Sequence, residues 1–97
     1  MKARYRAGQE DCLAAAGCAV RRLDLSVTGG DIRAETARVD ARSNQDQVVR
    51  ITVASDPDGS WVSFSAGREW TQDGKHIIAR LREAFECCLH DRGPRQG

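Results

Sequence analysis

Four cysteines and two histidines are the side chains of this sequence best suited to bind a metal or to act as nucleophiles. Cys12 and Cys18 are six positions apart, whereas Cys87 and Cys88 are adjacent. Zinc sites usually draw on closer pairs such as Cys-x2-Cys. Adjacent residues of a helix point about 100° apart, so Cys87 and Cys88 are badly placed to share one ion. We therefore expect no metal site and no cofactor.

Burial and oxidation are the other fates open to these thiols. In the cytosol, thiols stay reduced, so we expect most of the cysteines to act as small buried apolar side chains. A disulfide that joins the two ends of the chain is the alternative. Cys87 lies off the apolar stripe that contains Cys88, which predicts a half-buried, inert flank; a reactive or intermolecularly bonded thiol is the competing interpretation.

Catalytic groups are not brought together by the sequence pattern. His76 and His90 are fourteen residues apart on or beside one expected helix, a rise of roughly 20 Å that keeps them out of a common site. No Ser or Cys has a nearby His with an orienting acid. Glu83 and Glu86 lie near i,i+3 or i,i+4 spacing from basic residues and are best explained as their ion-pair partners. We expect a protein that is not an enzyme.

Trp61 is the most suggestive single residue. It occupies the polar phase of its strand, where a large aromatic side chain is not needed for the core. With Arg50 as an expected cross-strand neighbour and Arg22 or Arg33 nearby, it would form an exposed aromatic–arginine surface. Such residues anchor protein interfaces and also stack on nucleic-acid bases. Coverage by another element, or a local cation–π contact, is the structural alternative.

Trp70 and Arg68 precede the last helix. Trp70 is expected to pack back on the helix entry as a hydrophobic staple. An exposed binding residue is the alternative, so both side chains join the candidate partner-binding set.

The elements that must position these residues are clearest between 47 and 89. Val49, Ile51 and Val53 alternate with polar residues and predict a strand. Asp56-Pro57-Asp58-Gly59 is a strong turn signal, and Val62, Phe64 and Ala66 define a return strand. An amphipathic helix follows, with apolar residues at steps of three or four. These residues are Ile77, Ile78, Leu81, Ala84, Phe85, Cys88 and Leu89.

The first half of the chain is patterned less clearly. Residues 3–19 predict a helix, which begins near Gln9 if Gly8 breaks it. Leu23, Leu25 and Val27 predict a strand, and Gly29-Gly30 predicts a hairpin turn. The partner strand, 31–41, changes phase, which a bulge near Glu35-Thr36 would explain. A helix capped by Asp31 is the competing interpretation.

Together these elements predict an α+β fold in the order α-β-β-β-β-α. We expect an antiparallel meander of three or four strands with an N-terminal helix and a C-terminal amphipathic helix packed on one face. The inner face would carry Leu23, Val27, Ile51, Val53, Val62 and Phe64. The other face would carry Arg22, Ser26, Arg50, Thr52, Trp61 and Ser63 and meet water. Residues 1–91 would form one domain and 92–97 a flexible tail.

Charge and composition narrow the function classes. Thirteen arginines and two lysines leave a net charge of only +1, which argues against binding to polyanions by bulk electrostatics. No apolar run approaches a membrane span, and the N-terminus lacks the apolar region of a signal peptide, so we expect a cytoplasmic protein.

The leading hypothesis is therefore a small binding protein of inhibitor or adaptor type that works by protein–protein contacts. Small plain domains of this kind are common among phage and mobile-element products that block host defences, anti-CRISPR proteins included. Nucleic-acid binding is the second hypothesis: the helix–strands–helix order resembles that of double-stranded-RNA-binding domains, although only Lys75 and His76 stand where those domains carry a lysine cluster. A self-associating subunit, such as a homodimer through a free strand edge, is the third.

Overall fold

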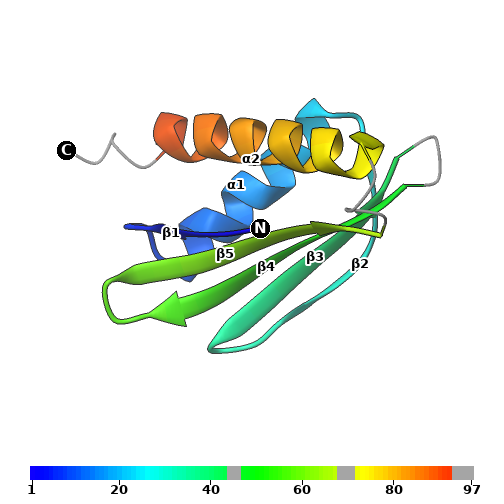
Figure 1. Ribbon diagram of the computed structural model, residues 1–97. Helices are drawn as coiled ribbons and strands as arrows, with labels where there is room; N and C mark the ends of the chain where they lie inside the picture. The colour runs from blue at the N-terminus through cyan, green and yellow to red at the C-terminus, as the bar shows by residue number, and fades with distance from the viewer. Residues whose placement is uncertain (44–46, 68–71, 93–97) are drawn as a thin grey trace.

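The computed structural model describes residues 1–43, 47–67 and 72–92. Both helices lie on the same face of one antiparallel sheet (Figure 1). The sheet order is β1-β5-β4-β3-β2, so β1 and β2 are its two edges. The elements are β1 (Lys2–Tyr5), α1 (Gln9–Arg22), β2 (Ser26–Ile32), β3 (Thr36–Arg42), β4 (Val48–Asp56), β5 (Gly59–Ala66) and α2 (Gln72–Arg92). The α+β class, with helices at both ends of a meander, is confirmed, and β1 is an additional strand.

The predicted β4–β5 hairpin is confirmed, including its turn. The Asp56 side chain accepts a hydrogen bond from the backbone N–H of Asp58 at 3.0 Å, which is the Asx turn that this residue type favours. Gly59 has φ of +151°, and a Cβ there would collide with the carbonyl oxygen of Tyr5 on the neighbouring strand. The turn therefore requires glycine both for its backbone conformation and for the close approach of β1.

The core lies between the sheet and the helices. Phe64 of β5 and Phe85 of α2 are fully buried, with ring centroids 5.3 Å apart in an edge-to-face arrangement. Leu81 and Phe85 confirm the predicted apolar face of α2. Helix α1 contributes small residues to the core, so it packs closely against the sheet but buries less area per residue. These small residues are Cys12, Ala15, Ala16 and Ala19.

The first strand corrects the expectation that the N-terminal helix could start at Ala3. Residues 2–5 pair with β5, from Lys2 opposite Ser63 to Tyr5 opposite Ser60. The helix begins at Gln9, where the alternative placed it. Four residues are too few for a period-2 pattern to stand out, and the strand is defined by its neighbour.

The prediction of a hairpin turn at Gly29-Gly30 is wrong. β2 continues through both glycines to Ile32, and the chain reverses afterwards, with Arg33 N–H bonded to Thr36 O. A Cβ on Gly30 would lie 2.6 Å from the carbonyl oxygen of Arg38, so this glycine permits close strand approach instead of a turn. The helix capped by Asp31 is also wrong, because the segment is strand.

The position of the strand irregularity and two residues of the predicted inner face, Leu23 and Val27, differ from the expectation. The irregular register falls between Val27 and Gly29, not near Glu35-Thr36. Val27 is 62% exposed and not in the core. Leu23 is the C-cap of α1 instead of a strand residue, and Asp24 follows it with φ of 56°. Among the three apolar residues of 23–27, Leu25 alone is buried.

The cysteines also depart from the main expectation. Cys18 of α1 and Cys88 of α2 form a disulfide across a sequence separation of 70, with their Cα atoms 6.2 Å apart. This is the alternative in which the two ends of the chain are joined. Cys12 is a buried free thiol, and Cys87 is an exposed one. The disulfide fixes the two helices to each other above the sheet.

α2 ends at Arg92, one residue into the segment expected to be a tail, and the rest of that segment lies outside the described residues. In the parts of the chain that the structure describes, neither helix is long and apolar enough to cross a membrane.

Candidate interaction surface

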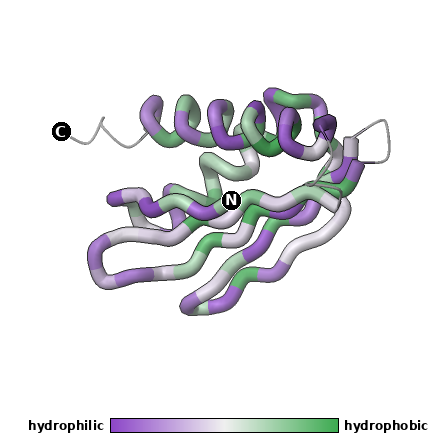
Figure 2. The backbone as a smooth tube through the Cα atoms, viewed as in Figure 1, coloured by the Kyte–Doolittle hydropathy of each residue, from purple (hydrophilic) through white to green (hydrophobic). Residues whose placement is uncertain are grey.

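The sheet face opposite the helices is built by strict alternation. From Val49 to Val53 of β4 and from Ser60 to Ala66 of β5, every second side chain is buried on the helix side of the sheet and the intervening ones point the other way. Figure 2 shows the resulting alternation of hydrophobic and hydrophilic residues along the strands. We call the helix-free side the open face. Strand register assigns to it Lys2, Arg4, Arg38, Asp40, Arg42, Arg50, Thr52, Trp61, Ser63 and Ser65.

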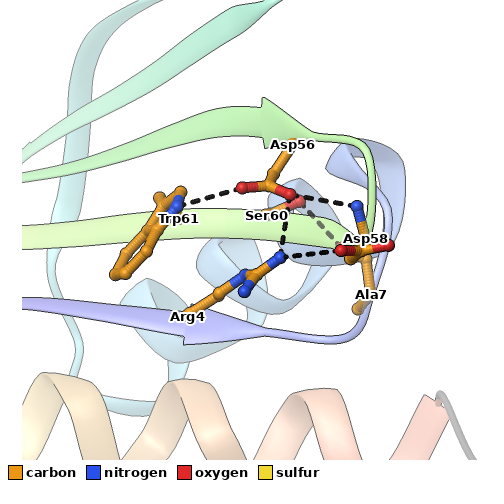
Figure 3. Close-up of polar contacts among 6 residues, drawn as sticks. All are labelled: Arg4, Ala7, Asp56, Asp58, Ser60 and Trp61. Carbon is orange, nitrogen blue, oxygen red and sulfur yellow. Dashed lines mark hydrogen bonds and ion pairs between the residues drawn. The ribbon is translucent and has the colours of Figure 1, made fainter.

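Trp61 lies on the open face and is 37% exposed. Its indole Nε1–H donates to Asp56 Oδ2 at 3.1 Å, across the hairpin (Figure 3). Lys2 Nζ and Arg4 Cζ, both from β1, lie 5.2 and 5.8 Å from the ring centroid. The ring is therefore fixed by one hydrogen bond and two cation–π contacts while part of its surface stays open to solvent.

Arg4 links the indole site to the β4–β5 turn. Its Nη2 lies 2.9 Å from Asp56 Oδ1 and 3.3 Å from Asp58 Oδ2, as the dashed lines in Figure 3 show. The Asp58 backbone N–H is the main reason that the pKa of Asp56 is lowered, and Arg4 and the Trp61 N–H lower it further. Asp56 is therefore a stable anion at neutral pH, which keeps the cluster intact. We call Lys2, Arg4, Asp56, Asp58 and Trp61 the Trp61 cluster.

A shallow depression adjoins this cluster. It has a volume of about 590 Å³ and is lined by Arg4, Tyr5, Arg6 and Asp58. Arg4 is shared between the depression and the indole contact.

A second charged group lies further along the open face. Asp40 of β3 forms ion pairs with two arginines. Its carboxylate oxygens lie 2.8 Å from Arg50 Nε and 3.2 Å from Arg38 Nε. Arg50 is opposite Asp40 and Ser65, whereas Trp61 is opposite Ala54. The expected cross-strand contact of Arg50 with Trp61 is thus wrong, although both side chains belong to the same face.

The other predicted neighbours of Trp61 are elsewhere. Arg22 ends α1 on the helix side of the sheet, where it contacts Cys87 Sγ at 3.1 Å and Asp91 at 3.5 Å. Arg33 follows the edge strand β2, which is separated from β5 by β4 and β3, and pairs with Asp31 at 2.7 Å. Neither reaches the Trp61 cluster. Trp70 and Arg68 lie outside the described residues.

Sequence reasoning missed Lys2 and Arg4 because it did not find β1. It identified Asp56 and Asp58 only as turn residues, although the turn aims their carboxylates at Arg4 and the indole. The available signal was the Lys-x-Arg alternation at the N-terminus, which matches the period of a strand.

Across residues 1–43, 47–67 and 72–92, no three His, Cys, Asp or Glu side chains gather in a way that could hold a metal ion. The geometry instead presents an indole, several arginines and their carboxylate partners on a flat sheet.

On the helix side, Tyr5 ties β1 to α2. Its hydroxyl donates to Glu86 Oε2 at 2.6 Å, and Arg82 Nε donates to the same oxygen at 3.0 Å. Burial of the phenol is the main reason that the pKa of Tyr5 is raised to about 12, and the hydrogen bond to Glu86 raises it further. The hydrogen bond from Tyr5, followed by Arg82, lowers the pKa of Glu86.

We expect the contact between Tyr5 and Glu86 to make the free energy of unfolding depend on pH in the alkaline range. The pKa of Tyr5 in the folded protein exceeds its ordinary value of 10.0. The contribution of Tyr5 to the free energy of unfolding is therefore complete below pH 10 and is lost as the pH rises towards about 12. Tyr5 is the only tyrosine, so its ultraviolet phenolate absorbance reports the ionisation directly. Glu86→Gln removes the carboxylate and should bring the phenol pKa down; an unchanged midpoint would contradict the assigned contact.

No family model matches the chain, and no curated protein matches its sequence.

Proposed function

We propose that this protein is a non-enzymatic binding module, of inhibitor or adaptor type, that contacts a protein partner through the Trp61 cluster on the open face. The observation that carries the proposal is the partly exposed indole of Trp61, held by Asp56 and flanked by two cations. Trp and Arg are the residues that most often dominate binding energy at protein interfaces. A side chain fixed before binding also loses little conformational entropy when a partner covers it.

Protein binding is favoured over nucleic-acid binding by the balance of charge. The open face carries five basic side chains, Lys2, Arg4, Arg38, Arg42 and Arg50. Asp40, Asp56 and Asp58 neutralise much of that charge in ion pairs of 2.8 to 3.3 Å. Phosphate backbones would have to displace these carboxylates. A mixed surface of paired charges around one aromatic residue suits a protein partner better.

The test is affinity capture from host lysate followed by measurement with the purified partner. Trp61→Ala should weaken binding about thirtyfold or more, as expected for a hot-spot residue. Arg80→Ala, on an exposed position of α2, is the matched control and should bind like the original protein. Failure to capture a stoichiometric partner, or equal binding by Trp61→Ala, would refute the proposal. Oligonucleotide binding that weakens steeply with salt would favour nucleic acid instead.

The cytoplasm remains the proposed compartment, and the disulfide offers a direct test of it. Disulfides persist mainly in oxidising compartments, whereas cytosolic thiols are usually reduced. Alkylation in denaturant during cell lysis, which also exposes the buried Cys12, should label all four cysteines if the native protein is cytoplasmic and reduced. Labelling of Cys12 and Cys87 alone would place the protein in an oxidising environment.

A further inference from the structure

β2 is an unprotected edge of the sheet. It lies at the end of the strand order (Figure 1), and all seven of its residues are exposed. The opposite edge, β1, is only four residues long, and its Tyr5 is bonded to α2. A long free edge is a template for pairing with another strand. β2 is therefore the edge at which the sheet can grow.

The backbone groups that face outward can be assigned from the ladder. Arg33 N–H bonds to Thr36 O, so residue 33 faces β3. Inward and outward groups alternate along an antiparallel strand. Asp31 and Gly29 therefore face β3, and the N–H and C=O groups of Gly30 and Ile32 point away from the sheet. Four backbone hydrogen-bonding groups are presented in a row.

The side chains of this edge do not protect it. Edge strands are normally blocked by lysine, proline or a charge that faces the approaching strand. β2 has neither lysine nor proline, and Asp31 is its single charged residue. Among the described residues, Ile32 and Val27 are the most exposed large hydrophobic side chains, at 75% and 62%. Both lie on the helix side of the strand by register with β3.

We propose that this edge pairs with a second copy of the chain, β2 against β2, to form one continuous ten-stranded sheet. The two-fold axis passes through Asp31, so that Gly30 of each copy is opposite Ile32 of the other. This register uses all four outward groups, which form four intermolecular hydrogen bonds. Each Ile32 side chain lies beside a glycine of the other copy, where no side chain obstructs it.

The charges of the edge are self-complementary in this register. The two Asp31 side chains meet at the axis, but each already pairs with its own Arg33 at 2.7 Å. Arg33 of each copy then lies diagonal to Asp31 of the other, so two carboxylates and two guanidinium groups alternate. β3 lies between β2 and the nearest strand that contributes to the Trp61 cluster, β4 with Asp56, so the dimer does not depend on the proposed partner site.

Sedimentation velocity over a wide concentration range tests the dimer. A strand-edge contact is small, so we expect a weak, reversible dimer. Ile32→Lys should weaken it about tenfold or more, because it replaces apolar contact by a charge at the edge. Val48→Lys, a similar change on β4, is the matched control and should dimerise normally. A monomer at all concentrations, or a dimer unaffected by Ile32→Lys, would overturn the proposal.

Cross-linking tests the register. In a Cys87→Ser background, which removes the exposed thiol, Asp31→Cys should form an intermolecular disulfide under mild oxidation. Opposed residues of a non-hydrogen-bonded pair have Cα atoms about 4.5 Å apart, within disulfide range. Ser26→Cys, far from the axis, should not cross-link. Equal cross-linking of the two variants, or none with Asp31→Cys, would reject this pairing.

Discussion

Reduction of the Cys18–Cys88 disulfide is expected to lower the free energy of unfolding by about 4 kcal/mol. The bond closes a loop with a sequence separation of 70, which includes every strand except β1. In the chain-entropy account, a loop of this size greatly restricts the unfolded chain. The bond also joins α1 to α2 directly, so its loss removes the covalent link between the two helices that cover the sheet.

Urea unfolding with and without a phosphine reductant measures this effect. The midpoint should fall markedly with reductant, and the double variant Cys18→Ala, Cys88→Ala should no longer respond to reductant. Cys87→Ser is the matched control, because it removes the neighbouring exposed thiol and leaves the bond intact. Its midpoint should shift with reductant as much as that of the original protein. An oxidised protein whose midpoint ignores reductant would contradict a structural role for the bond.

The disulfide also illustrates why part of this structure was not predictable from the sequence. Residue spacing argued against a metal site, but it could not choose between free thiols and a bond across 70 positions. That choice depends on whether α1 and α2 lie side by side, and the local pattern of neither helix encodes their relative position. Cys18 and Cys88 meet because both helices pack on the same face of the sheet.

Long periodic segments were predicted well for a physical reason. The β4–β5 hairpin and α2 each bury one face over many residues, so burial imposes a repeat that the sequence must show. β1 and β2 lack this constraint. β1 is too short to show a repeat, and β2 is exposed on both faces, so its Gly29-Gly30 pair looked like a turn. The sequence placed Trp61 in the polar phase, but its partners Lys2 and Arg4 depend on β1.

Phe85→Ala is the second substitution with a large expected effect, a loss of about 3–5 kcal/mol in the free energy of unfolding. Phe85 is fully buried, and its ring centroid lies 5.1 Å from that of Tyr5 and 5.3 Å from that of Phe64. The substitution therefore opens a cavity where α2 meets β1 and β5. Chemical denaturation measures the loss, with half-buried Leu89→Ala on the same helix as a control that should lose clearly less.

The disulfide and Phe85 stabilise the same helix in different ways, which makes their combination informative. Cys88 is three residues from Phe85, about one helical turn, so the bond keeps α2 near the sheet even when the ring is absent. Small domains are stable by only about 5–15 kcal/mol in total. Reduced Phe85→Ala should therefore be largely unfolded, whereas the oxidised variant stays folded with loosened packing. Far-ultraviolet circular dichroism distinguishes these states, and a fully folded reduced variant would show that α2 is held by other contacts.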